Sequence, residues 1–128
     1  MFRGFLRNKC PWVRITVVGR EEGAVEAIVD TGFNGYLTLP EEIAKRIGLT
    51  FTGSINSGTI ADGSTSASSV YIGKVICDNS RTDILVDVQP NCKILLGTAL
   101  LEELGLSLFV DIVANRVELN PSSRVNRP

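Results

Sequence analysis

The sequence predicts an all-β fold with two short helices. Runs rich in valine, isoleucine and threonine recur along the 128-residue chain, and Gly, Asn, Asp and Ser separate them. Only two segments carry apolar residues at helical spacing, and both end at a glycine. Hydrophobic residues make up 44% and charged residues 21% of the chain, which is typical of a globular protein. We therefore expect a single domain over residues 1–128, with its core at about 12–120 and a polar tail at 121–128.

The first predicted element is a β-hairpin. Its strands cover Val13–Val18, which is rich in β-branched residues, and Gly23–Val29, and the charged letters GREEG form the turn. The second strand runs directly into Asp30. An acidic side chain therefore stands where an apolar run should enter the core.

A short helix is predicted to follow. Pro40 suits a first helical turn, and the two glutamates after it suit the positive end of the helix dipole. Ile43 and Ile47 lie four residues apart, and Gly48 suits the end. The pattern predicts about two turns of helix whose two isoleucines pack into the core.

The next stretch, FTGSINSGTIADGSTSASSVYIGKVI, is rich in Gly, Ser and Thr, as a flexible linker would be. However, β-branched and aromatic residues return from Val70 onward, and Asp62-Gly63 is a strong hairpin-turn signal. The stretch therefore predicts a long polar hairpin with its tip at Ala61–Ser64, leading into a core strand.

Strand and helix signals then alternate to the end. TDILVDV predicts a strand, and NCKILLG holds a further short one. TALLEELG predicts a second helix, with Thr98 as its cap, three leucines on its apolar side and Gly105 at its end. LSLFVDIVANRVEL predicts a final hairpin that turns near Ala114–Arg116, and we expect the polar letters NPSSRVNRP to fray.

Charge and hydropathy limit the partners. The formal net charge is -1 and the basic residues are scattered, so we expect no nucleic-acid partner. No apolar run approaches the roughly 20 residues that span a bilayer, so we expect no membrane insertion. The start, MFRGFLRNKCPW, has no apolar stretch of signal-peptide length, and a cytoplasmic protein is the default expectation.

The chain has three cysteines without C-x-x-C spacing, and it has no histidine. Zinc sites built from Cys and His are therefore not expected, nor are nucleophiles that rely on a His base. We expect no metal and no cofactor, and we interpret the cysteines as small buried or half-buried apolar residues. Carboxylate, Ser, Thr, Lys and Tyr side chains remain for catalysis.

Two segments of the chain are similar to each other. AIVDTG, followed by a helix that ends AKRIGLT, is echoed by KILLGT, followed by a helix that ends LEELGLS. The similarity indicates a domain with approximate twofold symmetry, although strand, turn and helix in this order are also a common local pattern. The acidic residue occurs in only one of the two halves.

An apolar strand ending in D-T-G, a polar hairpin, I-L-L-G opening a short helix and a final hairpin follow one another over about residues 12–120. In this order they resemble the single-domain aspartic proteases, the retropepsins of retroviruses and their cellular and bacterial relatives. With phenylalanine after D-T-G, the motif resembles that of a prokaryotic branch of the group known by its D-T-G-F motif. The resemblance implies the closed barrel of retropepsin-like acid proteases, as one half of a homodimer.

The resemblance also implies roles for single residues. Asp30 would be the catalytic carboxylate. Thr31 would hydrogen-bond across the dimer axis, and Gly32 would allow the tight turn of the catalytic loop. Gly97 would be the matching point of close approach in the second half, beside Leu96, and both are candidates for the substrate cleft.

Two features depart from the retroviral pattern. Phe33 stands where retroviral members usually have alanine, and its ring is a further candidate for the substrate cleft, which it would narrow or reshape. The implied flap tip, Ala61, Asp62, Gly63 and Ser64, is more polar than a typical retroviral flap. Its Gly- and Ser-rich composition suits a mobile lid, although an ordinary surface hairpin has the same composition.

The chemistry explains why the motif predicts a partner. Two carboxylates in contact cannot both ionise, so one takes a proton from water while the other gives a proton to the substrate. One D-T-G supplies half of this pair, and no other acidic residue precedes Thr-Gly or Ser-Gly after an apolar run. The second carboxylate must then come from a second chain across a twofold axis, which makes homodimerisation a condition of catalysis.

Three functional hypotheses remain. The first is a homodimeric aspartic endopeptidase that cuts extended peptides or proteins. The second is a protease-fold module that binds peptide or dimerises with little or no catalysis. The third is an enzyme of another class in which D-T-G arose by chance, since Asp-Thr-Gly also suits plain turns.

Overall fold

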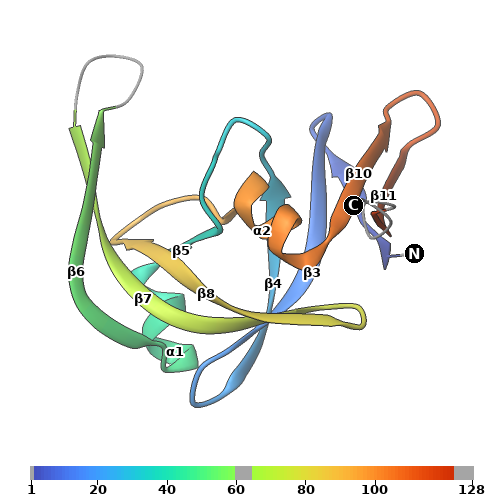
Figure 1. The fold of residues 1–128 in the computed structure, drawn as a ribbon. Helices are drawn as coiled ribbons and strands as arrows, with labels where there is room; N and C mark the ends of the chain where they lie inside the picture. Colours follow the sequence, from blue (N-terminus) through green and yellow to red (C-terminus); the bar gives the residue numbers. More distant parts are fainter. Residues whose placement is uncertain (1, 60–64, 123–128) are drawn as a thin grey trace, which may run out of the picture.

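The computed structural model describes residues 2–59 and 65–122 (Figure 1). Strands dominate this part of the chain, and both helices are short. In order, the elements are β1 (Phe2–Arg3), β2 (Phe5–Arg7), β3 (Cys10–Val18), β4 (Glu22–Val29), β5 (Leu37–Pro40), α1 (Glu41–Ile47), β6 (Thr50–Thr59), β7 (Thr65–Cys77), β8 (Ser80–Gln89), β9 (Leu95–Leu96), α2 (Thr98–Leu104), β10 (Leu106–Asp111) and β11 (Arg116–Pro121). The predicted all-β class with two short helices is confirmed.

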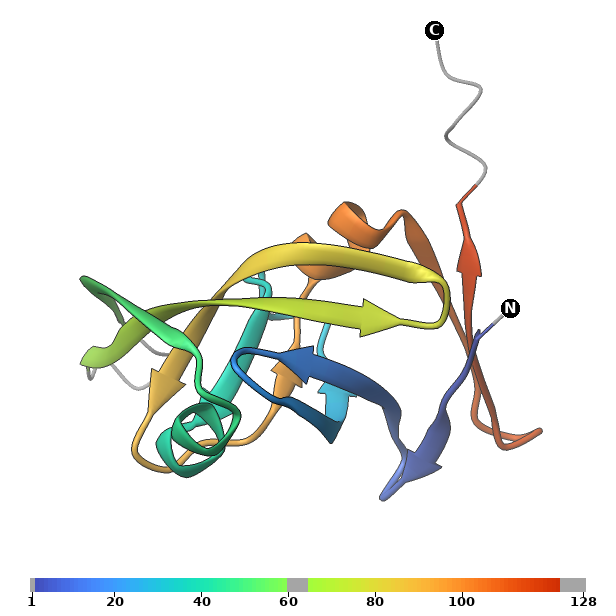
Figure 2. The same cartoon turned by 90° about the horizontal axis from the view of Figure 1, so that it is seen from below.

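The larger sheet closes into a barrel. Its order is β2-β3-β4-β9-β5-β8-β7-β6, and β3 also pairs with β7 through Val17 and Val75. The ring β3-β4-β9-β5-β8-β7 therefore returns to its first strand, and Figure 2 shows β3 and β7 side by side. The expectation of a closed barrel is confirmed.

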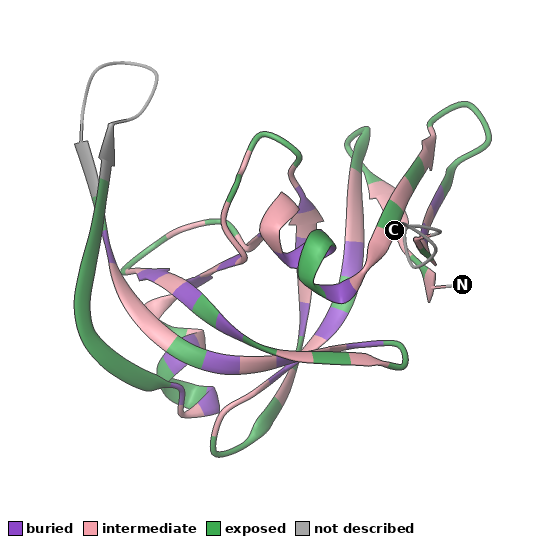
Figure 3. Ribbon diagram, in the orientation of Figure 1, coloured by how far each residue is buried: buried purple, intermediate pink, exposed green. Residues whose placement is uncertain are grey.

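Alternation along the strands sets the core. Val13, Ile15 and Val17 of β3 are buried, and the residues between them are less buried. Successive side chains of a strand point to opposite faces, so one face of each strand lines the barrel interior. Figure 3 shows this banding, with the outer arm β6 exposed along its described side chains.

Both helices end where the sequence predicts. Gly48 follows α1 with φ 80°, Gly105 follows α2 with φ 67°, and these left-handed conformations favour glycine. The capping prediction for the second helix is wrong. Gly97 is the N-cap, and Thr98 is the first helical residue.

The termini contribute more strand than the sequence predicts. β1 joins β11 and β10 in a separate sheet of order β1-β11-β10, and β2 extends the barrel sheet beside β3. Asn120 and Pro121, which we expected to fray, belong to β11 and pair with Ser107 and Leu106. The short strand β5 was also not predicted. Its pairing partners lie on β8 and β9, far along the chain.

Candidate active site

Asp30 follows β4 directly, and β4 pairs with the parallel strand β9. Ile28 and Val29 of β4 lie opposite Leu95 and Leu96 of β9, so the two similar segments of the sequence run side by side. The N–H of Asp30 then donates to the carbonyl oxygen of Leu96 at 3.0 Å. β9 therefore fixes the point at which Asp30 leaves the barrel.

A tight turn holds the Asp30 carboxylate. The N–H of Gly32 donates to Asp30 Oδ1 at 2.9 Å, and the N–H of Phe33 donates to the Asp30 carbonyl oxygen at 3.1 Å. Asp30 is half-buried, whereas Thr31 and Gly32 are exposed. The turn thus anchors one carboxylate oxygen, and no hydrogen bond within the described chain engages the other. The turn-capping interpretation and the catalytic one are compatible.

Two glycines, Gly32 and Gly97, lie close to neighbouring groups of the site. A methyl group at Gly32 would lie 3.2 Å from Asp30 Oδ1, so a side chain there would crowd the carboxylate. A methyl group at Gly97 would overlap the carbonyl oxygen of Gly35 and lie 2.7 Å from that of Phe33. Gly97 therefore has no room for a side chain, whereas at Gly32 a side chain would require the Asp30 carboxylate to shift by a few tenths of an ångström.

The start of α2 forms hydrogen bonds with the loop that follows Asp30. The N–H of Thr98 donates to the carbonyl oxygen of Phe33 at 2.9 Å, and its hydroxyl donates to the same oxygen at 3.4 Å. The N–H of Gly97 donates to the carbonyl oxygen of Tyr36 at 3.0 Å. The Thr98 hydroxyl is therefore used for this contact and not for capping α2.

The Phe33 ring folds back into its own loop. A methyl group at Gly35 would lie 2.5 Å from the ring atom Cζ, and one at Gly97 would lie 2.7 Å from Cδ2. The ring therefore fills the space that these two glycines leave, and it joins the loop to the start of α2. Leu96, the other apolar cleft candidate, is completely buried and supports the loop from the core.

Two pockets flank the loop. One, of about 550 Å³, contains Asp30 and Thr31. Its other lining residues are Lys9, Cys10, Pro11, Ile28, Val29, Lys93, Leu95, Leu108, Val110 and Ile112. This pocket is mainly apolar, and Asp30 is the only acidic residue among those that line it in the described chain. The sequence analysis did not predict that Leu108 and Val110 of β10 would line a pocket together with Asp30.

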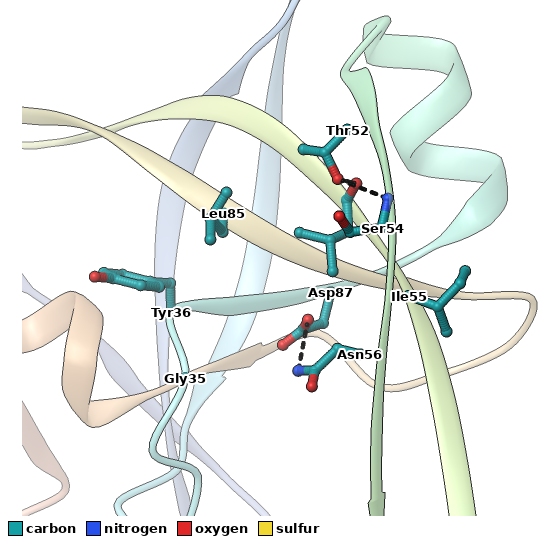
Figure 4. A pocket seen from close by; sticks show the side chains of 9 residues that line it. Gly35, Tyr36, Thr52, Ser54, Ile55, Asn56, Leu85 and Asp87 are labelled. Atoms are coloured by element: carbon teal, nitrogen blue, oxygen red, sulfur yellow. Dashed lines mark hydrogen bonds between the residues drawn. The ribbon is translucent and has the colours of Figure 1, made fainter.

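The second pocket, of about 480 Å³, lies between β6 and β8, and we call it the β6–β8 pocket (Figure 4). It is lined by Gly35, Tyr36, Thr52, Ser54, Ile55, Asn56, Val70, Leu85 and Asp87. Figure 1 shows the loop after β4 between the long β6–β7 hairpin and the β10–β11 hairpin. The two strands of the predicted long hairpin are β6 and β7, and the residues expected at its tip, Ala61, Asp62, Gly63 and Ser64, lie outside the described residues.

A family model described as "Aspartyl protease" matches residues 13–101, which is well over half of the chain. The chain belongs to the aspartyl protease family. The match runs from β3 to α2 and so includes the Asp30 turn, the long hairpin and Gly97. Together with the closed β-barrel, it identifies a single-domain retropepsin-like aspartic protease. A search of curated proteins gives no match.

The cysteines of this aspartyl protease differ in environment. Cys77 is buried and Cys92 is half-buried, as expected, but Cys10 is exposed because it lies at the start of β3 beside a tight turn. Burial raises the pKa of the Cys77 thiol to about 11, which keeps it protonated and unreactive near neutrality. In the part of the protease that the structure describes, no helix has the length and hydropathy to cross a bilayer.

Proposed function

We propose that this aspartyl protease is a homodimeric endopeptidase that activates water between two Asp30 carboxylates, one from each chain. The observation that carries the proposal is the turn at the end of β4, which holds a half-buried Asp30 by one oxygen at 2.9 Å from the Gly32 N–H. The other oxygen has no hydrogen bond within the described chain. It is available to a water molecule or to a second carboxylate.

The reaction divides between the two carboxylates. The ionised Asp30 takes a proton from water, and the water oxygen attacks the peptide carbonyl carbon. The protonated Asp30 gives its proton to the carbonyl oxygen. The Asp30 that took the proton from water then gives it to the peptide nitrogen, and the other Asp30 takes a proton from a hydroxyl of the tetrahedral intermediate as its C–N bond breaks. No second acidic side chain lines the Asp30 pocket in the described chain, so one copy supplies only one of the two groups.

The apolar wall of the Asp30 pocket supports dimerisation at this face. Leu108, Val110 and Ile112 line the pocket, and Ile112 is 54% exposed. β10 is the end strand of its sheet, with β11 as its partner within the described chain. An open strand edge beside exposed apolar residues is a surface that a second chain can cover. The proposed axis passes next to Asp30, and Thr31, which is exposed, would bond across it.

The proposed substrate is an extended peptide lying between the β6–β7 hairpin and the barrel. Leu85 on β8 is 50% exposed at the β6–β8 pocket, which adjoins the Asp30 loop through Gly35 and Tyr36. Main-chain pairing would supply affinity, and such apolar positions would supply selectivity. Ala61, Asp62, Gly63 and Ser64 would close over the peptide as the tip of the flap.

A peptide-library cleavage assay from about pH 3 to pH 8 tests the proposal, with Asp30→Asn as the control. We expect cleavage by the wild-type protein and none by the variant, whose side chain keeps the shape but not the acid-base chemistry. Equal behaviour of the two proteins at every pH would contradict it. Sedimentation at micromolar concentration tests the dimer. A strict monomer would favour the alternative, a protease-fold module that binds peptide with little catalysis.

A further inference from the structure

The β6–β8 pocket contains a charge that the proposed reaction does not use. Asp87 is its only charged lining residue, and its other lining residues in the described chain are neutral. Figure 4 shows the Asp87 carboxylate directed toward Asn56, with Leu85 and Tyr36 on the other side of the pocket. A carboxylate in a pocket of neutral groups favours a ligand that carries a positive charge.

The alternation of β8 places this carboxylate in the pocket. Ile84, Val86 and Val88 are buried in the barrel core, so Leu85 and Asp87 belong to the opposite face of the strand. Leu85 is 50% exposed, and Asp87 is half-buried. The Asp87 carboxylate is therefore attached to a strand of the barrel and not to a loop.

The Asp87 carboxylate is incompletely satisfied. Its one hydrogen bond within the described chain comes from Asn56 Nδ2, at a long distance of 3.4 Å to Oδ1. No lysine or arginine in this part of the chain forms an ion pair with it. A half-buried carboxylate with one weak neutral donor gains most from a cationic donor, because charge-assisted hydrogen bonds are the stronger ones.

The remaining walls suit a long cationic side chain. Leu85 and Tyr36 offer apolar surface on the side of the pocket away from Asn56 (Figure 4). The methylene groups of a lysine or arginine can lie along such surface while the charged end reaches a carboxylate deeper in the site. A volume of about 480 Å³ accommodates a side chain of that size.

We propose that the β6–β8 pocket receives a lysine or arginine side chain of the peptide substrate and that Asp87 pairs with its charge. The proposal rests on the proposed peptidase function. It adds to that function a preference for basic residues at one substrate position, set by a single residue of each chain.

The test uses pairs of peptides. The two members of a pair differ at one position, where one carries lysine and the other the neutral norleucine, and each pair tests a different position of the peptide. The measured quantity is the ratio of kcat/KM for the two peptides. For Asp87→Asn, which keeps an acceptor oxygen for Asn56, we expect this ratio to fall roughly ten- to a hundredfold at one position. Asp87→Lys should favour glutamate there. The matched control is Asp83→Asn, an exposed residue of the same strand outside the pocket, which should leave the ratio unchanged.

The outcomes separate the two proposals. If the wild-type protein cleaves the peptides but the ratio is the same in Asp87→Asn at every position, the charge preference is wrong and the peptidase function stands. If no peptide is cleaved, the peptidase function fails, and fluorescence anisotropy with the same peptides decides on the pocket. Tighter binding of lysine peptides that is lost in Asp87→Asn supports the pocket proposal, and equal binding or no binding overturns it.

Discussion

The N–H of Asp30 donates to the carbonyl oxygen of Leu96 at 3.0 Å, although the two residues come from opposite halves of the chain. Leu96 is completely buried, so this bond ties the turn that carries the proposed catalytic carboxylate to the barrel core. Charged groups that must meet across an interface need a rigid support, because small displacements cost much of the rate. The bond to Leu96 supplies part of that support.

Phe33 and Gly35 should prove energetically coupled. Gly35→Ala brings a methyl group to 2.5 Å from the Phe33 ring, and we expect it to lower the free energy of unfolding by about 1–3 kcal/mol. Phe33→Ala should lower it by about 2 kcal/mol through lost packing. In the double variant the clash is gone, so Gly35→Ala should cost much less there. Urea unfolding of all four proteins measures the cycle, and additive effects would show that the ring does not occupy this space.

Gly97→Ala should destabilise the protein more than Gly53→Ala does. Its methyl group would overlap the carbonyl oxygen of Gly35, a backbone atom that cannot move without displacing the loop. We expect a loss of about 2–3 kcal/mol in the free energy of unfolding. Gly53→Ala is the comparison. Nothing lies within 4 Å of its methyl position, and only its φ of 86° opposes the change, by about 1 kcal/mol. A smaller loss for Gly97→Ala would argue against the close approach.

A charge on the wall of the Asp30 pocket should weaken the proposed dimer. Ile112→Lys places an ammonium group among apolar residues that a second chain would cover, and we expect the dimer dissociation constant to rise at least about tenfold. Ile72→Lys is the matched control, since Ile72 is 48% exposed and lies on β7, outside this pocket. Sedimentation over a concentration series distinguishes them. Equal effects of both variants would move the interface elsewhere.

Cys77 should make stability fall at alkaline pH. Burial raises the pKa of its thiol from 9.0 to about 11, so between these values the unfolded chain has released a proton that the folded chain retains. Stability therefore decreases as pH rises through this window, by a total of about 2–3 kcal/mol. Cys77→Ala should remove this part of the decrease, and Cys10→Ala, at an exposed thiol, should not. Urea midpoints between about pH 8 and pH 11 measure the difference, and parallel curves for Cys77→Ala and the wild type would refute it.

Local signals explain what could be predicted. β-branched runs gave the first hairpin, and the glycines at 48 and 105 marked the helix ends, because each depends on residues close in sequence. β5 was missed because its four residues are strand only through pairing with β8 and β9. Thr98 was assigned as a cap because its type suits one, but close packing requires glycine at the true N-cap.

The same reason limits prediction of the site. Asp30, Thr31 and Gly32 form one contiguous motif, so the sequence alone marks them as candidates. Asp87 and Leu108 join pockets only because strands distant in sequence meet in space, and no local pattern distinguishes them from other strand residues. The packing of the Phe33 ring against Gly97 was hidden for the same reason.

Closure of the barrel also orders events in time. The pairing of Val17 with Val75 joins segments far apart along the chain, and such contacts form late because loop-closure entropy opposes them. During synthesis, the residues of the Asp30 turn leave the ribosome well before Leu96, to which the turn is bonded, has been made. A nascent chain therefore carries the acidic motif long before that motif has its working shape. On the proposed function, cleavage therefore requires a chain that has been completed at least as far as Leu96, because the bond from the Asp30 N–H cannot form earlier.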